Sequence, residues 1–234
     1  TPWFMTKTWL SILSTCVYFI SMFLATFINT AFYHEIMQAL NGQPVSLRRG
    51  LRFASQRWQA ILLWSLFAGL VGLIIRHLEE RFSLIGRFIA GLLGLAWSVS
   101  CIFILPTLVR DTATINPVQL LKNSASTLRT TWGELVIGYV GVEAALITIL
   151  LGTLFTYGMG TMALYWALPG VAAHYGAAIL FGGLGIMLTE VIVLSWLSNL
   201  INPVYRSALY IYATEGVVPE HFDQELLDTA WKVK

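Results

Sequence analysis

Two carboxylates lie in the middle of long apolar stretches of the sequence. Glu143 falls within the stretch 135–157, and Glu190 falls within the stretch 171–197. A charged side chain at the centre of a bilayer costs about 2.5–3.5 kcal/mol on insertion scales, so such residues are functional candidates. Both are therefore candidates for an ion or proton path. The alternative is a structural carboxyl group that is protonated or hydrogen-bonded.

The neighbours of each carboxylate predict which way it points. Glu190 follows Gly183 by seven residues, so it shares a stripe of small residues and is expected to face the protein interior. Glu143 lies about 200° around its helix from a stripe of small residues that we expect to pack inside. It would then face lipid, a second subunit or another helix, which suggests a homo-oligomer or a larger membrane complex. The stripe comprises Gly138, Gly141, Ala145, Thr148 and Gly152.

Basic side chains gather in amphipathic segments beside the apolar stretches. Such segments lie at the membrane surface, where Lys and Arg face anionic lipid. We therefore predict a lipid-facing basic patch of Arg48, Arg49, Arg52, Arg57, Lys122 and Arg129.

A separate charged turn is expected on the opposite side of the membrane, formed by Arg76, His77, Glu79, Glu80 and Arg81. Its four-residue spacings allow pairing within one helix. Metal binding by His77 with a neighbouring glutamate is the alternative, but the spacing matches no strong metal-site pattern, and we expect no metal or cofactor.

The elements that must position these residues are membrane spans. Of the 234 residues, 57% are hydrophobic and 11% charged, against about 25% charged in soluble domains. A span needs about 20 mainly apolar residues, and five stretches qualify: 9–33, 58–75, 84–109, 135–157 and 171–197. The alternation typical of β-barrels is absent, so we predict an all-α polytopic transmembrane helix bundle. A net charge of +2 argues against a nucleic-acid partner.

An amide–proline–valine pattern occurs three times, beginning at Gln43, Asn116 and Asn202. An amide side chain before proline suits a helix start. The pattern predicts interfacial helices after alternate spans, at 45–57, 117–131 and 203–213. Residues 1–214 would form the bundle, and 215–234 an acidic tail.

Positively charged residues near the span ends predict the orientation. Eight Lys and Arg residues fall on one side and four on the other, so the richer side and the C-terminus are expected in the cytoplasm. Because the chain starts at Thr1 immediately before a span, we expect a preceding span, which would make six in the full protein.

Four short motifs carry a resemblance to an uncharacterised family of bacterial polytopic membrane proteins: Leu78-Glu79-Glu80-Arg81-Phe82, Ala96-Trp97-Ser98, Trp132-Gly133-Glu134 and Arg206-Ser207-Ala208-Leu209-Tyr210-Ile211-Tyr212-Ala213. The resemblance implies a bacterial inner-membrane location and six spans. It supplies no catalytic or binding residues.

Two function classes remain open. One is a channel- or transporter-like module for an ion or small solute, with its path near the two carboxylates. The other is a non-catalytic accessory membrane protein that binds anionic lipid or a partner membrane complex. An enzyme is not expected, because no nucleophile, base or metal pair occurs at a recognisable spacing.

Overall fold

The computed structural model describes residues 2–81, 84–217 and 219, so most of the predicted acidic tail lies outside the described part of the chain. Within that part every regular element is a helix, which confirms the all-α prediction. The helices are α1 (Pro2–Leu40), α2 (Leu47–Gln56), α3 (Trp58–Arg81), α4 (Leu84–Ser100), α5 (Ile104–Arg110), α6 (Pro117–Ala167) and α7 (Pro169–Glu215).

Five segments of these helices are long and apolar enough to cross a membrane, as the sequence predicts. They are Trp9–Leu40, Trp58–Arg81, Gly86–Arg110, Gly141–Ala167 and Ala173–Glu215. The third segment contains a break between α4 and α5. Pro106 explains the break, because proline clashes with the carbonyl four residues earlier and cannot continue the turn that ends α4.

The chain divides into two compact units. Unit 1 comprises Thr1–Trp132 together with Arg206–Lys234, and unit 2 comprises Gly133–Tyr205. Each of the two long helices α6 and α7 contributes one part to unit 1 and the other part to unit 2.

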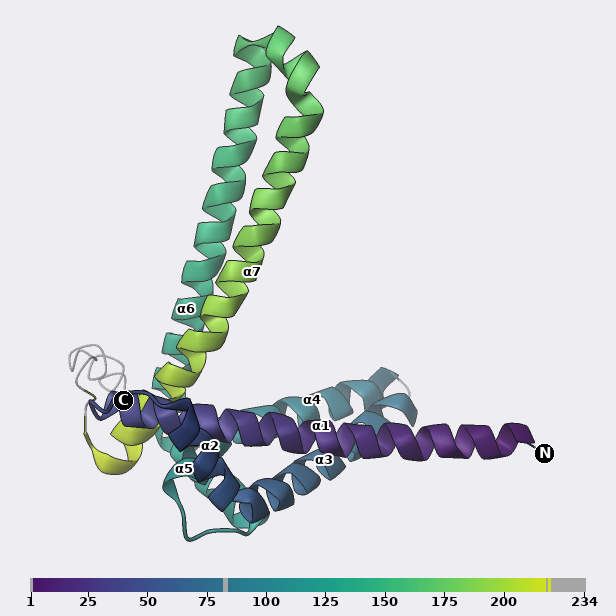
Figure 1. The fold of residues 1–234 in the computed structure, drawn as a ribbon, viewed down its shortest axis with the longest axis vertical. Coiled ribbons are helices and arrows are strands. Elements are labelled where there is room, and N and C mark those ends of the chain that lie inside the picture. Colours follow the sequence, from purple (N-terminus) through teal and green to yellow (C-terminus); the bar gives the residue numbers. More distant parts are fainter. Residues whose placement is uncertain (1, 82–83, 218, 220–234) are drawn as a thin grey trace. The chain divides into compact units, whose positions relative to one another are not determined.

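In unit 1, α1 packs against α2, α3 and α5, and α3 packs against α4 (Figure 1). The indole rings of Trp64 and Trp97 stack between α3 and α4, with centroids 6.1 Å apart. Two small residues of α4 face α3, because Ala90 is buried and a Cβ built on Gly94 would lie 3.5 Å from Ile75. Close helix approach through small residues therefore holds the two spans together.

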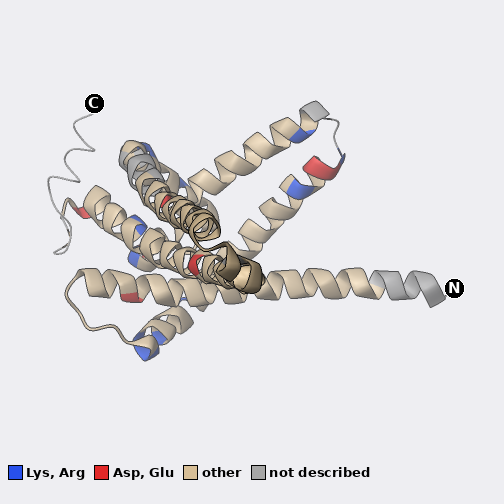
Figure 2. Cartoon of the chain, turned by 90° about the horizontal axis from the view of Figure 1, so that it is seen from above, with Lys and Arg blue, Asp and Glu red and all other residues tan. Residues whose placement is uncertain are grey.

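The charged residues of unit 1 that the structure describes lie near the ends of its spans rather than along them (Figure 2). One end collects contacts from several elements: Arg49 pairs with Glu35 of α1, and Arg110 pairs with Glu215 of α7. Asn123 of α6 donates to the Asp111 carboxylate at 3.1 Å. The basic segments that the sequence assigns to one side of the membrane thus meet at one end of unit 1.

Unit 2 is an antiparallel hairpin of α6 and α7, joined at Leu168 (Figure 1). Gly183 and Gly176 of α7 face aromatic side chains of α6, because a Cβ on either would run into a tyrosine ring or its hydroxyl. These two glycines pack as the sequence predicts. Gly141 and Gly152 of α6 do not pack in this way, because a side chain at either position would meet open space.

The three amide–proline–valine segments behave differently. Asn116 is a helix cap, whose Oδ1 accepts the Val118 backbone N–H at 2.9 Å, and Pro117 opens α6 as predicted. The first segment precedes a separate helix, but α2 starts three residues after its proline. The third prediction is wrong, because Pro203 lies inside α7. Residues 117–131 and 203–213 therefore belong to long continuous helices rather than to separate short ones.

Candidate functional site: the polar seam of the α6–α7 hairpin

Glu143 points from α6 toward α7. Its Oε1 accepts a hydrogen bond from the Ser198 hydroxyl at 2.7 Å and another from the Asn202 amide at 3.3 Å. The Asn202 amide also donates to the Ser198 hydroxyl at 3.0 Å, so the three side chains form a closed group. The expectation that small residues would face α7 is wrong here. A carboxyl group inside an apolar span is costly without hydrogen-bond donors, and this cost outweighs the gain from packing the small residues closely. Glu143 therefore takes the face toward α7.

Glu190 points from α7 toward α6, in agreement with its predicted inward face. Its Oε1 accepts a hydrogen bond from the Thr153 hydroxyl at 2.8 Å. Its Oε2 is buried and has no hydrogen-bond partner among the described residues. Glu190 also lines an open groove of about 680 Å³, whose other walls are mainly apolar side chains of α7. One carboxyl oxygen is thus bound, and the other lacks a donor at the wall of a groove.

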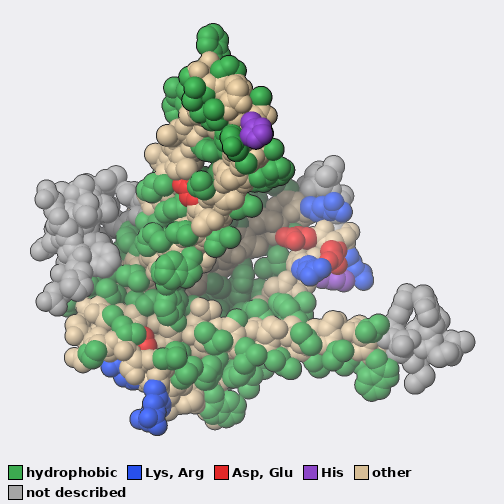
Figure 3. Space-filling model, turned by 45° about the horizontal axis from the view of Figure 1, so that its top comes forward, with side chains coloured by type: hydrophobic (Ala, Val, Ile, Leu, Met, Phe, Trp, Pro, Cys, Tyr) green, Lys and Arg blue, Asp and Glu red, His purple; other side chains and the backbone are tan. Residues whose placement is uncertain are grey.

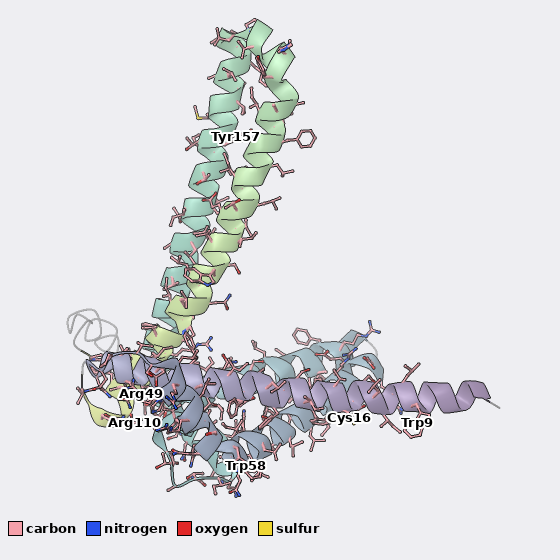
Figure 4. All side chains as sticks on the ribbon, viewed as in Figure 1. Trp9, Cys16, Arg49, Trp58, Arg110 and Tyr157 are labelled. Atoms are coloured by element: carbon pink, nitrogen blue, oxygen red, sulfur yellow. The ribbon has the colours of Figure 1, made fainter. Side chains whose placement is uncertain are left out.

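A tyrosine extends the same line of polar groups. The hydroxyl of Tyr157 on α6 donates to the backbone carbonyl of Ile179 on α7, and its ring packs over Gly183 (Figure 4). Thr153 and Tyr157 line a second open groove of about 450 Å³. The Thr153–Glu190 hydrogen bond therefore joins residues from the walls of the two grooves. We call Glu143, Ser198, Asn202, Thr153, Glu190 and Tyr157 the polar seam.

Many hydrophobic side chains are exposed on the face of the hairpin that Figure 3 shows. Ile147, Phe155, Phe181 and Ile192, for example, are all more than half exposed. An apolar exterior with polar groups directed between the two helices is the arrangement expected of a membrane-spanning hairpin. Sequence reasoning identified the two carboxylates but missed their partners, because isolated Thr, Ser and Asn residues occur throughout the apolar stretches.

Unit 1 holds a second polar cluster, around Glu35 near the C-terminal end of α1. Glu35 as a whole residue is 5% exposed. It accepts Arg49 Nε at 3.0 Å and Nη2 at 2.7 Å, and the Ser46 backbone N–H at 2.6 Å. His34 Nδ1 lies 3.0 Å from Oε1, and its ring stacks on Phe53 of α2. These contacts clamp α2 against α1.

Arg57 joins α2 and α3 to the chain that follows α5. Its guanidinium donates to the carbonyls of Asp111 at 2.8 Å and Thr114 at 3.1 Å, and also to that of Thr112. A cation suits the C-terminal end of a helix, where carbonyls lack partners within the helix. Partial burial lowers the pKa of Arg57, and the nearby Asp111 carboxylate opposes this effect.

The six residues of the predicted lipid-facing patch thus divide into two groups. Arg49 and Arg57 are directed at partners within unit 1, as described above. The other four, Arg48, Arg52, Lys122 and Arg129, are exposed. Neither Glu35 nor the carbonyls after α5 were predicted as partners, so the sequence did not separate internal arginines from external ones.

The family of the chain is shown by a family model that matches residues 10–219. The chain belongs to DUF6159, a family of unknown function. No curated protein and no solved structure matches the chain. Membership of DUF6159 agrees with the predicted uncharacterised family, while the bacterial origin and the sixth span implied by the resemblance stay predictions.

The charged turn of this DUF6159 chain has the internal pairing that its spacing allows. Arg76 Nε donates to Glu80 Oε1 at 3.0 Å, and both side chains are largely exposed. His77, Glu79 and Arg81 are exposed as well. Among the residues that the structure describes, no group of three His, Cys, Asp or Glu residues is placed to hold a metal ion. The turn is thus a solvated surface feature, remote in sequence from the polar seam.

Proposed function

We propose that this membrane protein is a channel- or transporter-like module for an ion or small solute, with a path along the polar seam of the α6–α7 hairpin. The single observation that carries the proposal is the second oxygen of Glu190, which is buried without a donor at the wall of a groove. Leaving a buried polar atom unpaired costs free energy. A carboxyl oxygen that is buried and unpaired inside a span, despite this free-energy cost, is a candidate for binding a transient ligand.

The polar seam provides two stations for such a ligand. Glu190 with Thr153 forms one, and Glu143 with Ser198 and Asn202 forms the other. Along α6 the two stations are ten residues apart, which corresponds to about 15 Å of helix. That is about half the apolar thickness of a bilayer. A proton or small cation could therefore pause at two depths, with carboxylate and hydroxyl oxygens replacing part of its water shell.

Location and assembly form part of the proposal. The resemblance of the four sequence motifs supports a bacterial inner-membrane location, and the excess of Lys and Arg at one end of the spans supports an orientation with the basic ends and the C-terminus in the cytoplasm. The small residues on the outer face of α6 leave room for another helix, which supports a homo-oligomer or a larger membrane complex.

Reconstitution into liposomes tests the proposal. Purified protein is inserted into vesicles that contain a pH-sensitive dye, and proton flux is measured with and without a potassium gradient. We expect Glu190→Gln to lower the flux at least about ten-fold, because the neutral amide neither exchanges a proton nor holds a cation at full charge. Glu79→Gln, at an exposed site in the charged turn, is the matched control and should leave the flux unchanged.

Two results would count against the proposal. Equal flux in the Glu190→Gln and Glu79→Gln proteins would remove Glu190 from the path. An absence of flux for protons, sodium, potassium and small organic ions would remove the transport class itself.

The second candidate is an accessory role, in which the protein binds anionic lipid or a partner membrane complex without transporting anything. The observation that favours it is the set of exposed basic side chains at one end of unit 1. It predicts a protein that co-purifies in fixed ratio after mild solubilisation, and that is lost when Lys122 and Arg129 are neutralised. A chain that purifies alone under those conditions argues against a partner complex.

A further inference from the structure

Helix α2 has three distinct faces. Gly50 and Ala54 are buried, and Arg49 lies beside them on the side clamped to α1. Leu47 and Leu51 are 76% and 40% exposed and lie one turn apart along a second face, and Trp58, the first residue of α3, is 49% exposed. The third face carries Arg48 and Arg52, which are exposed and one turn apart.

The connections of α2 fix where its outer faces can be. The segment Trp9–Leu40 ends a few residues before α2, and the segment Trp58–Arg81 begins one residue after it. A helix held between two spans by such short links must remain at the membrane surface. Its inner face cannot roll away, because a Cβ on Gly50 would lie only 2.7 Å from the Ala31 carbonyl oxygen, which means that the two helices touch.

We propose that α2 is a binding face for anionic phospholipid. Leu47, Leu51 and Trp58 enter the boundary between headgroups and acyl chains, while Arg48 and Arg52 contact the phosphates. Guanidinium groups suit this task, because they form two parallel hydrogen bonds with phosphate oxygens. The order of the faces, with an apolar stripe next to a basic stripe, is that of an interfacial amphipathic helix. The inference does not depend on transport.

The geometry also distinguishes the arginines that bind lipid from those that hold the fold. Arg49 donates hydrogen bonds to the Glu35 carboxylate from both Nε and Nη2, and Arg57 donates to backbone carbonyls after α5. Neither is available to a phosphate without breaking unit 1. Arg48 and Arg52 are exposed and take no part in the Glu35 clamp, so neutralising them removes charge from the surface and leaves the clamp in place.

Lipid binding by the full chain in a neutral detergent tests this directly. Fluorescent phosphatidylglycerol is titrated into purified protein, with phosphatidylcholine as the neutral comparison. We expect Arg48→Gln/Arg52→Gln to weaken phosphatidylglycerol binding about 30-fold, since each basic residue near an anionic surface contributes a factor of about five. The control Arg81→Gln/Arg87→Gln removes the same charge from exposed positions at the far ends of α3 and α4, and binding should be unchanged.

Unchanged binding in the α2 double variant would overturn the proposal, and so would an equal loss in the control variant, because bulk charge would then explain the affinity. Excess inorganic phosphate should not compete, since it lacks the acyl chains that the apolar stripe contacts. Competition by phosphate would mean an ion site rather than a lipid face, and would also overturn the proposal.

A second measurement tests the apolar stripe without relying on affinity. Spin labels are placed at position 51 or position 56 of protein in which Cys16 and Cys101 are replaced by alanine, and the protein is put into bilayers. A label at 51 should be relaxed by oxygen dissolved in the lipid, and a label at 56 by a water-soluble nickel chelate. If both labels report water, α2 does not lie on the membrane and the proposal fails.

Discussion

Replacing Glu35 with glutamine should loosen the attachment of α2 to α1. The two carboxylate oxygens accept hydrogen bonds from Nε and Nη2 of Arg49 and from the Ser46 backbone N–H, and the His34 ring nitrogen lies 3.0 Å from one of them. Glutamine keeps the shape but has one oxygen, and its NH₂ group would face two donors. If the glutamine amide is rotated by 180°, its NH₂ group meets the donors on the other side instead, because both original oxygens face donors.

The expected loss of stability depends on how deeply each partner of the Glu35–Arg49 ion pair is buried. A hydrogen bond to a charged group contributes about 1.5–3 kcal/mol, and breaking a fully buried ion pair costs about 3–5 kcal/mol. The Glu35 side chain is 7% exposed and the Arg49 side chain 36% exposed, so water can solvate part of the freed guanidinium. We therefore expect Glu35→Gln to lower the unfolding free energy by about 2–4 kcal/mol.

A double-mutant cycle measures the pair itself. Unfolding is followed by tryptophan fluorescence in mixed micelles of increasing dodecyl sulfate fraction, for Glu35→Gln, Arg49→Gln and the double variant. We expect a coupling of about 1.5–3 kcal/mol. Glu80→Gln is the matched control, because its pair with Arg76 is largely exposed on both sides and should be worth less than about 1 kcal/mol. Additive single effects, or a control that costs as much as Glu35→Gln, would refute the reasoning.

Three further changes test packing and capping by the same unfolding assay. Gly50→Ala should lower stability by about 1–3 kcal/mol because its methyl meets a backbone carbonyl of α1, whereas Gly91→Ala, which faces open space, should be neutral or stabilise by up to about 1 kcal/mol. Gly183→Ala should cost about 1–3 kcal/mol against the ring of an opposing tyrosine, and Gly185→Ala, with nothing near it, should not; equal effects would argue against the hairpin packing. Arg57→Lys should cost about 1–2 kcal/mol, because a point charge cannot reach several carbonyls with the fork geometry of a guanidinium; a cost below about 0.5 kcal/mol would show that the positive charge alone is sufficient.

The spans were predictable because they depend on a property that is local in the sequence. About 20 apolar residues in a row leave the backbone only one way to satisfy its hydrogen bonds in lipid. The start of α6 was predictable for a similar reason, since Asn116 and Pro117 need no distant partner to begin a helix. The spans and the start of α6 therefore do not depend on how the helices are arranged in space.

The third amide–proline pair shows why local rules fail elsewhere. Asn202 has the side chain of a helix cap, but its amide donates to Glu143 and to Ser198 instead. These bonds hold the side chain toward Glu143, and its Oδ1, the atom that would cap a helix, is buried with no hydrogen-bond partner among the described residues. Pro203 removes a backbone donor and crowds the carbonyl four residues earlier, yet α7 continues through it. The competing partner is 59 residues away in the sequence, and no periodicity reveals it.

The Glu35 cluster was missed for a different reason. The sequence interpretation assigned all nearby arginines to lipid and gave Glu35 no partner. The structure buries Gly50 and Ala54 of α2. Small residues allow the close approach that lets Arg49 reach Glu35, so a glycine and an alanine one turn apart were the signal for the packed face.

The partners of the three carboxylates follow from their positions along the spans. Glu35 lies near the end of its span and takes an arginine, whose own side chain still reaches water. Glu143 and Glu190 lie further inside and take hydroxyl and amide donors. A second full charge at their depth would be costly to insert, whereas Ser, Thr and Asn provide donors at little cost. Neutral donors also bind a carboxyl group more weakly than a guanidinium does. The carboxylates of the polar seam are therefore held more weakly than Glu35, whose contacts with Arg49 and Ser46 attach α2 to α1.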